Sequence, residues 1–318
     1  MKLQFLGAAR QVTGSQYYLQ ANGSKILVDC GMYQERSYLE RNWAPSLVRP
    51  RDIDTLLLTH AHVDHCGLAP KLVREGFRGR IRTTDASAEL VEVILRDSAH
   101  IQMEDAAYKR KRHKKEGRKS KYPVEPLFTT RDVERTLRLL KPVSYDEIVR
   151  VNDDLSVVFH DAGHILGSAM VELRVGHNEN ARRVLFSGDI GQTDKPLVRD
   201  PTKIADADYL IMESTYGDRN HEDRGDVGKQ LADVINRTLS AGGNLVIPTF
   251  AIERSQEVIY QLSLLMHEGR IPQVPVFLDS PMAVDATDIF RRYRQHFDEE
   301  TWTLITAGGA PLKFPTLN

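Results

Sequence analysis

Four side chains of types that bind metals lie within six positions, in the run His60-Ala61-His62-Val63-Asp64-His65. The run directly follows a short apolar segment that is typical of a buried strand. Because alternate residues of an extended backbone point to the same side, His60 and His62 can face one ion. The turn that follows can direct Asp64 and His65 at a second position nearby. Neutral imidazoles and carboxylates suit zinc, so the run predicts a zinc site.

Four ligands cannot complete two metal positions, so further ligands must come from later in the chain. The candidates are His164, in Asp161-Ala162-Gly163-His164, and Asp189, in Ser187-Gly188-Asp189. Both follow apolar strands, and the glycine before each allows the backbone to approach a crowded centre. A carboxylate can bridge two cations, and we assign that role to Asp189. We expect the remaining histidines to be non-ligands, namely His100, His113, His160, His177, His221, His267 and His296.

The elements that must position these residues change in pattern along the chain. Before Gly217, strands are predicted at 2–7, 15–21, 25–28, 54–59, within 148–174, at 184–186 and at 209–212, with helices at 68–75, 86–109 and 130–140. After Gly217, helices at 227–239, 255–267 and 284–297 alternate with strands at 244–247 and 274–278. Such alternation is typical of β-α-β units with a parallel sheet. We therefore predict an α/β protein of two domains, residues 1–215 and 216–318, whose final segment, 301–318, has nothing after it to pack against.

Positive charge is concentrated in residues 109–121, which contain nine Lys or Arg and one Glu and begin Lys109-Arg110-Lys111-Arg112. Such a run can neutralise RNA phosphates, although it is equally typical of a solvated loop. Arg254 is a second candidate for a backbone phosphate, unless it ties down its own helix. The net charge of −1 restricts any attraction to nucleic acid to local patches of this kind.

The bulk composition excludes several other classes of protein. No run approaches 18 apolar residues and the first ten residues do not resemble a signal peptide, so we expect no membrane segment and no leader. Cys30 and Cys66 are too few for a disulfide framework and predict reduced thiols in the cytoplasm.

The order of the His-x-His-x-Asp-His run, the later His164 and the later Asp189 resembles the metallo-β-lactamase superfamily over residues 1 to about 215. The resemblance implies an αββα sandwich with zinc at the edge of its two sheets. It implies one zinc held by His60, His62 and His164, and a second held by Asp64 and His65, with Asp189 between them. Asp29 matches the superfamily's first motif, an aspartate that orients the site from behind the ligands.

Three later stretches, 213–219, 248–257 and 278–283, resemble motifs of the β-CASP RNA-processing nucleases. The likeness is closest to prokaryotic homologues of the endonuclease subunit of the cleavage and polyadenylation specificity factor. It implies a zinc-dependent ribonuclease that hydrolyses RNA through a metal-bridged hydroxide, with catalytic roles for Asp64, Asp189 and Glu213. Glu213 would orient a histidine that the family supplies further along the chain. No such stretch occurs here, so we expect a chain truncated at its C-terminus, a partial β-CASP domain and an incomplete second zinc site.

Two alternatives to a ribonuclease remain open. A small-molecule hydrolase of the same fold, acting on thioesters or lactones, is disfavoured because such enzymes need no inserted β-α-β domain. A non-catalytic RNA-binding subunit is disfavoured because all six visible ligands are present. The expected partner is RNA rather than a membrane, and a homodimer is left open.

Overall fold

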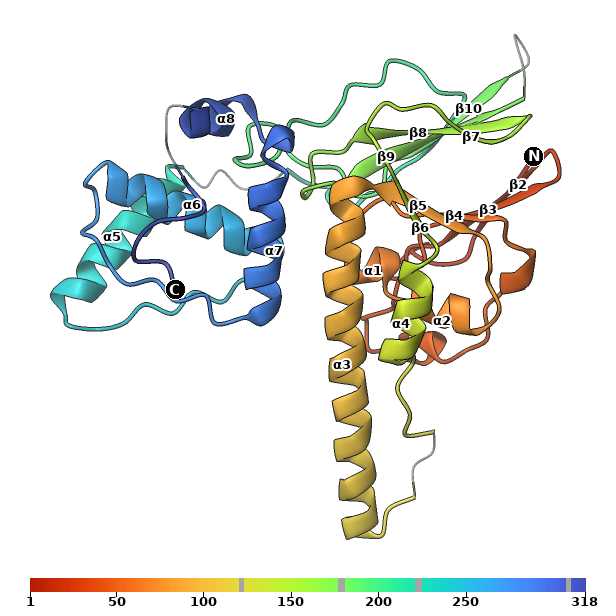
Figure 1. Cartoon of the computed structure of the whole chain (residues 1–318), viewed down its shortest axis with the longest axis horizontal. Coiled ribbons are helices and arrows are strands. Elements are labelled where there is room, and N and C mark those ends of the chain that lie inside the picture. Colours follow the sequence, from red (N-terminus) through yellow and green to blue (C-terminus); the bar gives the residue numbers. More distant parts are fainter. Residues whose placement is uncertain (120–122, 177–180, 221–224, 307–309) are drawn as a thin grey trace. The chain divides into compact units, whose positions relative to one another are not determined.

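The structure is a computed structural model that describes residues 1–119, 123–176, 181–220, 225–306 and 310–318. It forms two compact units (Figure 1). The first contains residues 1–190 and 201–213, and the second contains residues 191–200 and 214–318. Residues 191–200 thus belong to the second unit although they precede the end of the first. Two histidines expected to be non-ligands, His177 and His221, lie outside the described residues.

The first unit begins with a six-stranded sheet. Its strands, in both sequence and spatial order, are β1 (Lys2–Phe5), β2 (Tyr17–Ala21), β3 (Ser24–Val28), β4 (Thr55–Leu57), β5 (Arg80–Thr84) and β6 (Leu140–Val143). The first three pair in antiparallel fashion, and β3 to β6 run parallel. Strands β2 and β3 are joined by a tight turn at Asn22-Gly23, with φ values of 46° and 81°. Both angles suit the tight turn that follows the twist of the two strands.

A second sheet of five strands completes the core of this unit. Its spatial order is β11 (Tyr209–Ile211), β10 (Arg182–Phe186), β9 (Ala169–Val175), β8 (Leu155–Asp161) and β7 (Val149–Asn152). Only β10 and β11 are parallel. Alternate residues of these strands, such as Val157, Phe159, Val171 and Leu173, are fully buried against apolar residues of the first sheet. The period-2 pattern therefore places one face of each sheet in a shared core.

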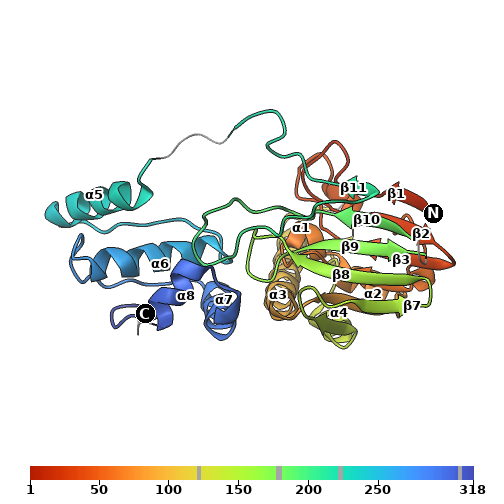
Figure 2. The ribbon, with the colours of Figure 1, turned by 90° about the horizontal axis from the view of Figure 1, so that it is seen from above.

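Helices cover the first sheet on its far side (Figures 1 and 2). They are α1 (Val63–Cys66), α2 (Ala69–Arg74), α3 (Asp85–Glu116) and α4 (Thr130–Leu137), with 3-10 turns at Leu39–Asn42 and Pro50–Asp52. Thr129 caps α4 through a reciprocal pair of hydrogen bonds with Asp132. In the described part of this unit these helices lie on the outer face of the first sheet.

The outer face of the second sheet is instead partly polar. The Glu172 side chain is only 1% exposed and accepts hydrogen bonds from Arg174 Nε at 2.6 Å and Arg183 Nε at 2.9 Å. His160 lies between two carboxylates, with Nε2 2.9 Å from Glu172 and Nδ1 2.7 Å from Asp146. Burial alone would raise the pKa of Glu172, but these hydrogen bonds outweigh it and lower the pKa to about 2.

Helix α3 is longer than its sequence pattern predicted. The basic run does not begin a loop at residue 109 but forms the last two turns of the helix, which ends at Gly117 with a φ of 62°. Lysine and arginine are good helix formers, and cations near a helix C-terminus interact favourably with its dipole. Among the described residues no helix, α3 included, is both long and apolar enough to cross a membrane.

The second unit consists mainly of helices. They are α5 (Val227–Ser240), α6 (Arg254–His267), α7 (Pro281–Arg292) and α8 (Glu299–Thr306), with a 3-10 turn at Arg294–His296. Helices α5 and α6 share an apolar cluster that includes Ile235, Leu262 and Leu265. The side-chain amide of Gln256 on α6 donates to Thr287 on α7 at 2.9 Å.

The two strands predicted in this unit do not form a ladder. Residues 244–247 are no strand, and the side chain of Val246 is 83% exposed. Residues 276–278 instead pair with the end of the chain, where Val276 and Leu317 form a parallel bridge. The tail therefore does pack, contrary to expectation. A strand requires a neighbour for its backbone groups, and only 276–278 finds one among the described residues.

Candidate metal centre

The predicted ligands converge because the strands that precede them end at one edge of the first unit. Strands β3 and β4 are parallel, so Asp29 and His60 emerge side by side. His164 and Asp189 follow β8 and β10 of the second sheet. The two sheets are joined at this edge by a hydrogen bond from the Ala169 amide to the Thr59 carbonyl, 2.8 Å long. Residues separated by more than 100 positions in sequence thus meet at one point.

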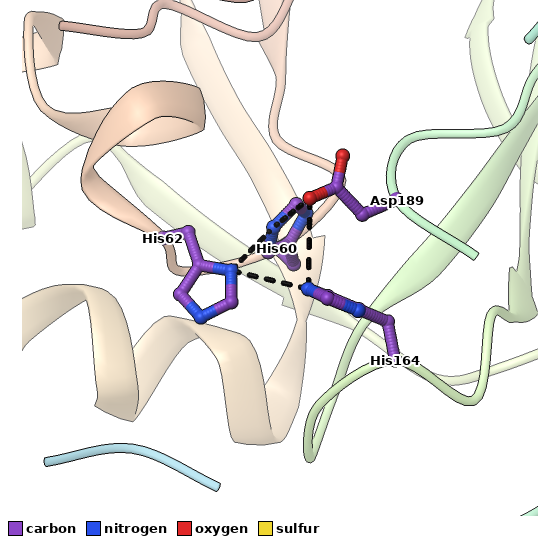
Figure 3. Close-up of side chains that lie close together, drawn as sticks. All are labelled: His60, His62, His164 and Asp189. Atoms are coloured by element: carbon purple, nitrogen blue, oxygen red, sulfur yellow. Dashed lines mark hydrogen bonds and ion pairs between the residues drawn. The ribbon is translucent and has the colours of Figure 1, made fainter. Parts of the chain in front are cut away.

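Three histidines and one aspartate face a common centre (Figure 3). One ligand atom from each of His60, His62, His164 and Asp189 lies within 4.8 Å of all the others. His62 Nδ1 is 3.0 Å from His60 Nε2 and 3.2 Å from His164 Nε2. Asp189 Oδ2 is 3.7 Å from His60 Nε2 and 3.6 Å from His164 Nε2.

These separations fit a zinc-sized ion. With tetrahedral bonds of about 2.0–2.1 Å, neighbouring ligand atoms would stand roughly 3.3–3.4 Å apart. The four observed distances between ligand atoms, 3.0, 3.2, 3.6 and 3.7 Å, lie on either side of that value. Burial and the neighbouring imidazoles lower the pKa of His60 well below its ordinary value, so its ring is neutral, the form that binds metal. The donor set therefore fits a bound divalent cation.

A second group of ligand types lies on the other side of the Asp189 carboxylate. Asp189 Oδ1 is 3.1 Å from His65 Nε2, and Asp64 Oδ2 is 3.9 Å from the same nitrogen. Asp189 thus presents one oxygen to each group. Burial would raise the pKa of Asp189, but the hydrogen bond from His65 and the surrounding imidazoles lower it to about 2. Burial raises the pKa of Asp64.

Asp29 holds this second group from behind. It is fully buried, and its Oδ2 lies 2.7 Å from His65 Nδ1. The Thr59 amide and hydroxyl donate to its two oxygens at 2.8 and 2.9 Å, and the Ser15 hydroxyl lies 3.3 Å away. Burial disfavours a charged His65 ring, but Asp29 and Asp189 outweigh it and raise the pKa of His65 well above its ordinary value. The contact directs His65 Nε2 towards Asp64 and Asp189.

The sequence did not single out Thr59 or Ser168, although both shape the centre. Thr59 supports Asp29, as described above, and the Ser168 hydroxyl accepts from the His164 amide at 3.0 Å. The only local signal for Thr59 is its place directly before His60. The glycine before Asp189 has the role expected of it, because Gly188 has a φ of 54° and a Cβ there would lie 2.8 Å from Thr59 Cβ.

Other predicted site residues lie outside this cluster. Glu213 Oε1 accepts from the Ile190 amide at 2.7 Å, which places it behind the loop that carries Asp189. Arg254 is bound within its own helix, where Nη1 lies 2.5 Å from Glu257 Oε2. The four basic candidates are exposed near the end of α3: Lys109, Arg110, Lys111 and Arg112.

Comparison with known proteins agrees with this geometry. Residues 9–240 match the family described as the metallo-beta-lactamase superfamily, and residues 255–318 match the Beta-Casp domain. The chain therefore belongs to the metallo-β-lactamase superfamily, and its C-terminal part is of the β-CASP type.

Several curated relatives are similar over almost the whole chain. Ribonuclease TTHA0252 of Thermus thermophilus is 38% identical over 98% of this chain and 66% of its own length. Transcription termination factor FttA of Methanosarcina mazei is 32% identical over 97% of this chain and 46% of its own. Probable RNase MJ4 of Methanocaldococcus jannaschii is 31% identical over 95% and 64%. The chain thus spans about half to two thirds of the length of these relatives.

Proposed function

We propose that this chain is the metal-binding part of a zinc-dependent ribonuclease that hydrolyses RNA phosphodiester bonds. The observation that carries the proposal is the Asp189 carboxylate, which faces a three-histidine group with one oxygen and the His65–Asp64 group with the other. Relatives named as ribonucleases, and the β-CASP match, favour RNA as the substrate. Two zinc ions are the proposed complement, one for each group.

Each ligand has a distinct part in this proposal. His60, His62 and His164 would hold one ion, and Asp64 and His65 the other, with Asp189 shared between them. Two bound zinc ions would lower the pKa of a coordinated water and neutralise charge on the phosphoryl group. Asp29 accepts the Nδ1 proton of His65 and so keeps Nε2 free as the ligand atom. Among the described residues the second group has two ligands of its own, Asp64 and His65, against three histidines in the first, so it would bind its ion more weakly.

Glu213 acts in this scheme as a positioning residue. Its carboxylate accepts from the Ile190 amide, next to Asp189, and its own amide donates to the Ser187 hydroxyl at 3.1 Å. These bonds tie the end of β11 to the loop that carries the shared ligand. Loss of the Glu213 carboxylate would therefore displace Asp189 rather than remove a ligand.

RNA would be attracted by the basic end of α3. From Lys109 to Lys119 the described residues carry eight Lys or Arg side chains and one Glu. Only Lys109, Arg112 and Arg118 form ion pairs there, with Asp105 and Glu116. The remaining cations are available to neutralise phosphates. Arg254 is a weaker candidate, because Glu257 already compensates its charge.

The decisive test is the Asp64→Ala variant assayed on single-stranded RNA, together with zinc analysis. We expect a zinc-loaded full-length form to cleave RNA, the 318-residue chain to cleave it far more weakly, and the Asp64→Ala variant to lose cleavage while it keeps the three-histidine zinc. Hydrolysis of thioesters or lactones without RNA cleavage would instead indicate a small-molecule hydrolase. RNA binding without any hydrolysis would indicate a non-catalytic subunit.

We also propose a cytoplasmic location. Cys30 and Cys66 are buried and unpaired, as expected for thiols in a reducing compartment. Burial raises the pKa of the Cys30 thiol to about 12, which keeps it protonated and unreactive. The homodimer remains a prediction.

A further inference from the structure

Two loops of the first unit emerge at the same sheet edge as the metal ligands. Strands β1, β3 and β4 run in the same direction, so the loop after β1 (residues 7–15) and the loop after β3 (residues 31–47) begin where the histidine run begins. Both are joined to that run directly. The Ser15 amide donates to the Asp64 carbonyl at 2.9 Å, and the Met32 amide donates to the Val63 carbonyl at 3.0 Å. We call these two loops the rim.

Side chains of the second loop hold the first loop in place. Glu35 Oε1 accepts from the amides of Val12 and Thr13 at 2.9 and 3.0 Å, and Oε2 accepts from the Thr13 hydroxyl. Arg41 donates to Gln11 at 3.1 Å. A carboxylate that replaces three hydrogen bonds to water with three bonds to one loop fixes the shape of that loop.

The two ends of the first loop, near Leu6 and Gly14, are also constrained by side chains of the second loop. The Tyr33 hydroxyl donates to the Leu6 carbonyl at 3.0 Å. The Tyr33 ring packs so closely on Gly14 that a Cβ added to Gly14 would lie 2.5 Å from a ring carbon. Asn42 exchanges hydrogen bonds with the Tyr33 backbone at 2.8 and 2.7 Å. Residues 41–43 are therefore held against the base of the first loop.

Held by these contacts, the first loop adopts an uncommon backbone conformation. Ala8 and Arg10 have φ values of 49° and 64°, although neither is a glycine. Non-glycine residues persist in this region only where their surroundings impose it, and such sites cluster at ligand-binding positions. Arg10 itself is exposed.

The side chains exposed on the rim include two arginines and a tryptophan, which are types that bind single-stranded nucleic acid. Arg10 and Arg36 are exposed, and neither forms an ion pair or hydrogen bond with another described side chain. Trp43 is 47% exposed, and it directly follows Asn42, which is hydrogen-bonded to the Tyr33 backbone. Arginine contacts phosphates irrespective of sequence, and an exposed aromatic ring stacks on any base.

We propose that the rim binds the RNA strand next to the metal centre, with Arg10 on a phosphate and Trp43 stacked on a base. This inference rests on the proposed ribonuclease function and adds a binding surface to it. The rigid frame made by Glu35 and Tyr33 means that the surface exists before RNA arrives. RNA binding therefore does not have to overcome the conformational entropy of disordered loops.

The test is RNA binding by Arg10→Ala and Trp43→Ala, measured as fluorescence anisotropy of a labelled single-stranded RNA at several salt concentrations. We expect Trp43→Ala to weaken binding about tenfold and Trp43→Phe to recover most of it, because a ring still stacks. Arg10→Ala should lower the slope of log affinity against log salt by about one, and Arg10→Lys should restore it. Arg80→Ala is the matched control. Arg80 is exposed at the start of β5, and the metal ligands lie beyond the other end of these parallel strands.

The outcomes separate this inference from the function on which it rests. Zinc content and hydrolysis of a small phosphodiester should stay at wild-type level in all the variants, since the rim contributes no ligand. If the wild-type chain binds and cleaves RNA but Arg10→Ala and Trp43→Ala bind like Arg80→Ala, the rim assignment alone is wrong. If the wild type neither binds nor cleaves RNA, the proposed function has failed and the rim proposal fails with it.

Discussion

The Asp29→Asn substitution tests whether one buried carboxylate holds half of the metal centre. Asp29 is fully buried and accepts from four protein groups, the Thr59 amide, the Thr59 hydroxyl, the Ser15 hydroxyl and His65 Nδ1. An asparagine has almost the same shape but keeps a single acceptor oxygen. Its amide group would face donors that the carboxylate now satisfies, so His65 would lose its partner while the fold keeps its volume.

The size of the effect follows from those contacts. Hydrogen bonds to charged groups contribute about 1.5–3 kcal/mol each, and the variant loses at least one of them, so we expect unfolding of the metal-free protein to become easier by about 2–4 kcal/mol. Loss of a residue that orients a ligand typically lowers metal affinity by about 10–100-fold. That loss should fall on the His65–Asp64 position, because Asp29 touches none of the three clustered histidines directly.

Two measurements check this prediction, urea unfolding of the metal-free chain and zinc titration against a competing chelator. The control is Asp52→Asn, which removes only an exposed ion pair with Lys25 and should change stability by less than about 1 kcal/mol. Wild-type zinc affinity at both positions in Asp29→Asn would refute the reasoning. An equal loss at both positions would also refute it, because it would mean that Asp29 acts on the whole fold rather than on His65.

Three further predictions use other parts of the chain. His62→Ala should lose the zinc of the three-histidine group, whereas His267→Ala, an exposed histidine of α6, should retain a full complement by elemental analysis; equal zinc in both would contradict the assignment. Glu172 has a folded pKa of about 2, below the 4.5 of a free carboxyl, so it stabilises the fold above that pH and the contribution disappears as the pH falls towards 2. Glu172→Gln should therefore cost about 1–3 kcal/mol at neutral pH and flatten the acid limb of a stability–pH curve, and an unchanged acid limb would show that the cluster is not coupled to folding. Reversing the charge of Lys111 and Lys115 together to Glu should weaken RNA binding and reduce its salt dependence, while identical salt slopes would exclude the end of α3 from the RNA path.

Local patterns in the sequence were sufficient for the elements with strong periodicity or turn chemistry. The Asn22-Gly23 hairpin and the helices on either side of Gly243 lie where alternation and helical spacing put them. The grouping of His60 and His62 also follows from local geometry, because residues two apart on an extended backbone share a face. The end of α3 was missed because charge was read as a loop signal, whereas lysine and arginine favour helix when a glycine such as Gly117 closes it.

Only the tertiary structure determined which contacts the distant residues of the metal centre make with one another. The glycine and the strand before Asp189 were sufficient to predict it as a ligand. Its two oxygens face different ligand groups, and this arrangement depends on the order of β8, β9 and β10 in the second sheet. Glu213 could be named from its motif, but its contact with the Ile190 amide is visible only in the structure. Such contacts join residues whose separation in the chain bears no relation to their separation in space. They are set by strand pairing and by the need to satisfy buried polar groups, and a local sequence pattern records neither.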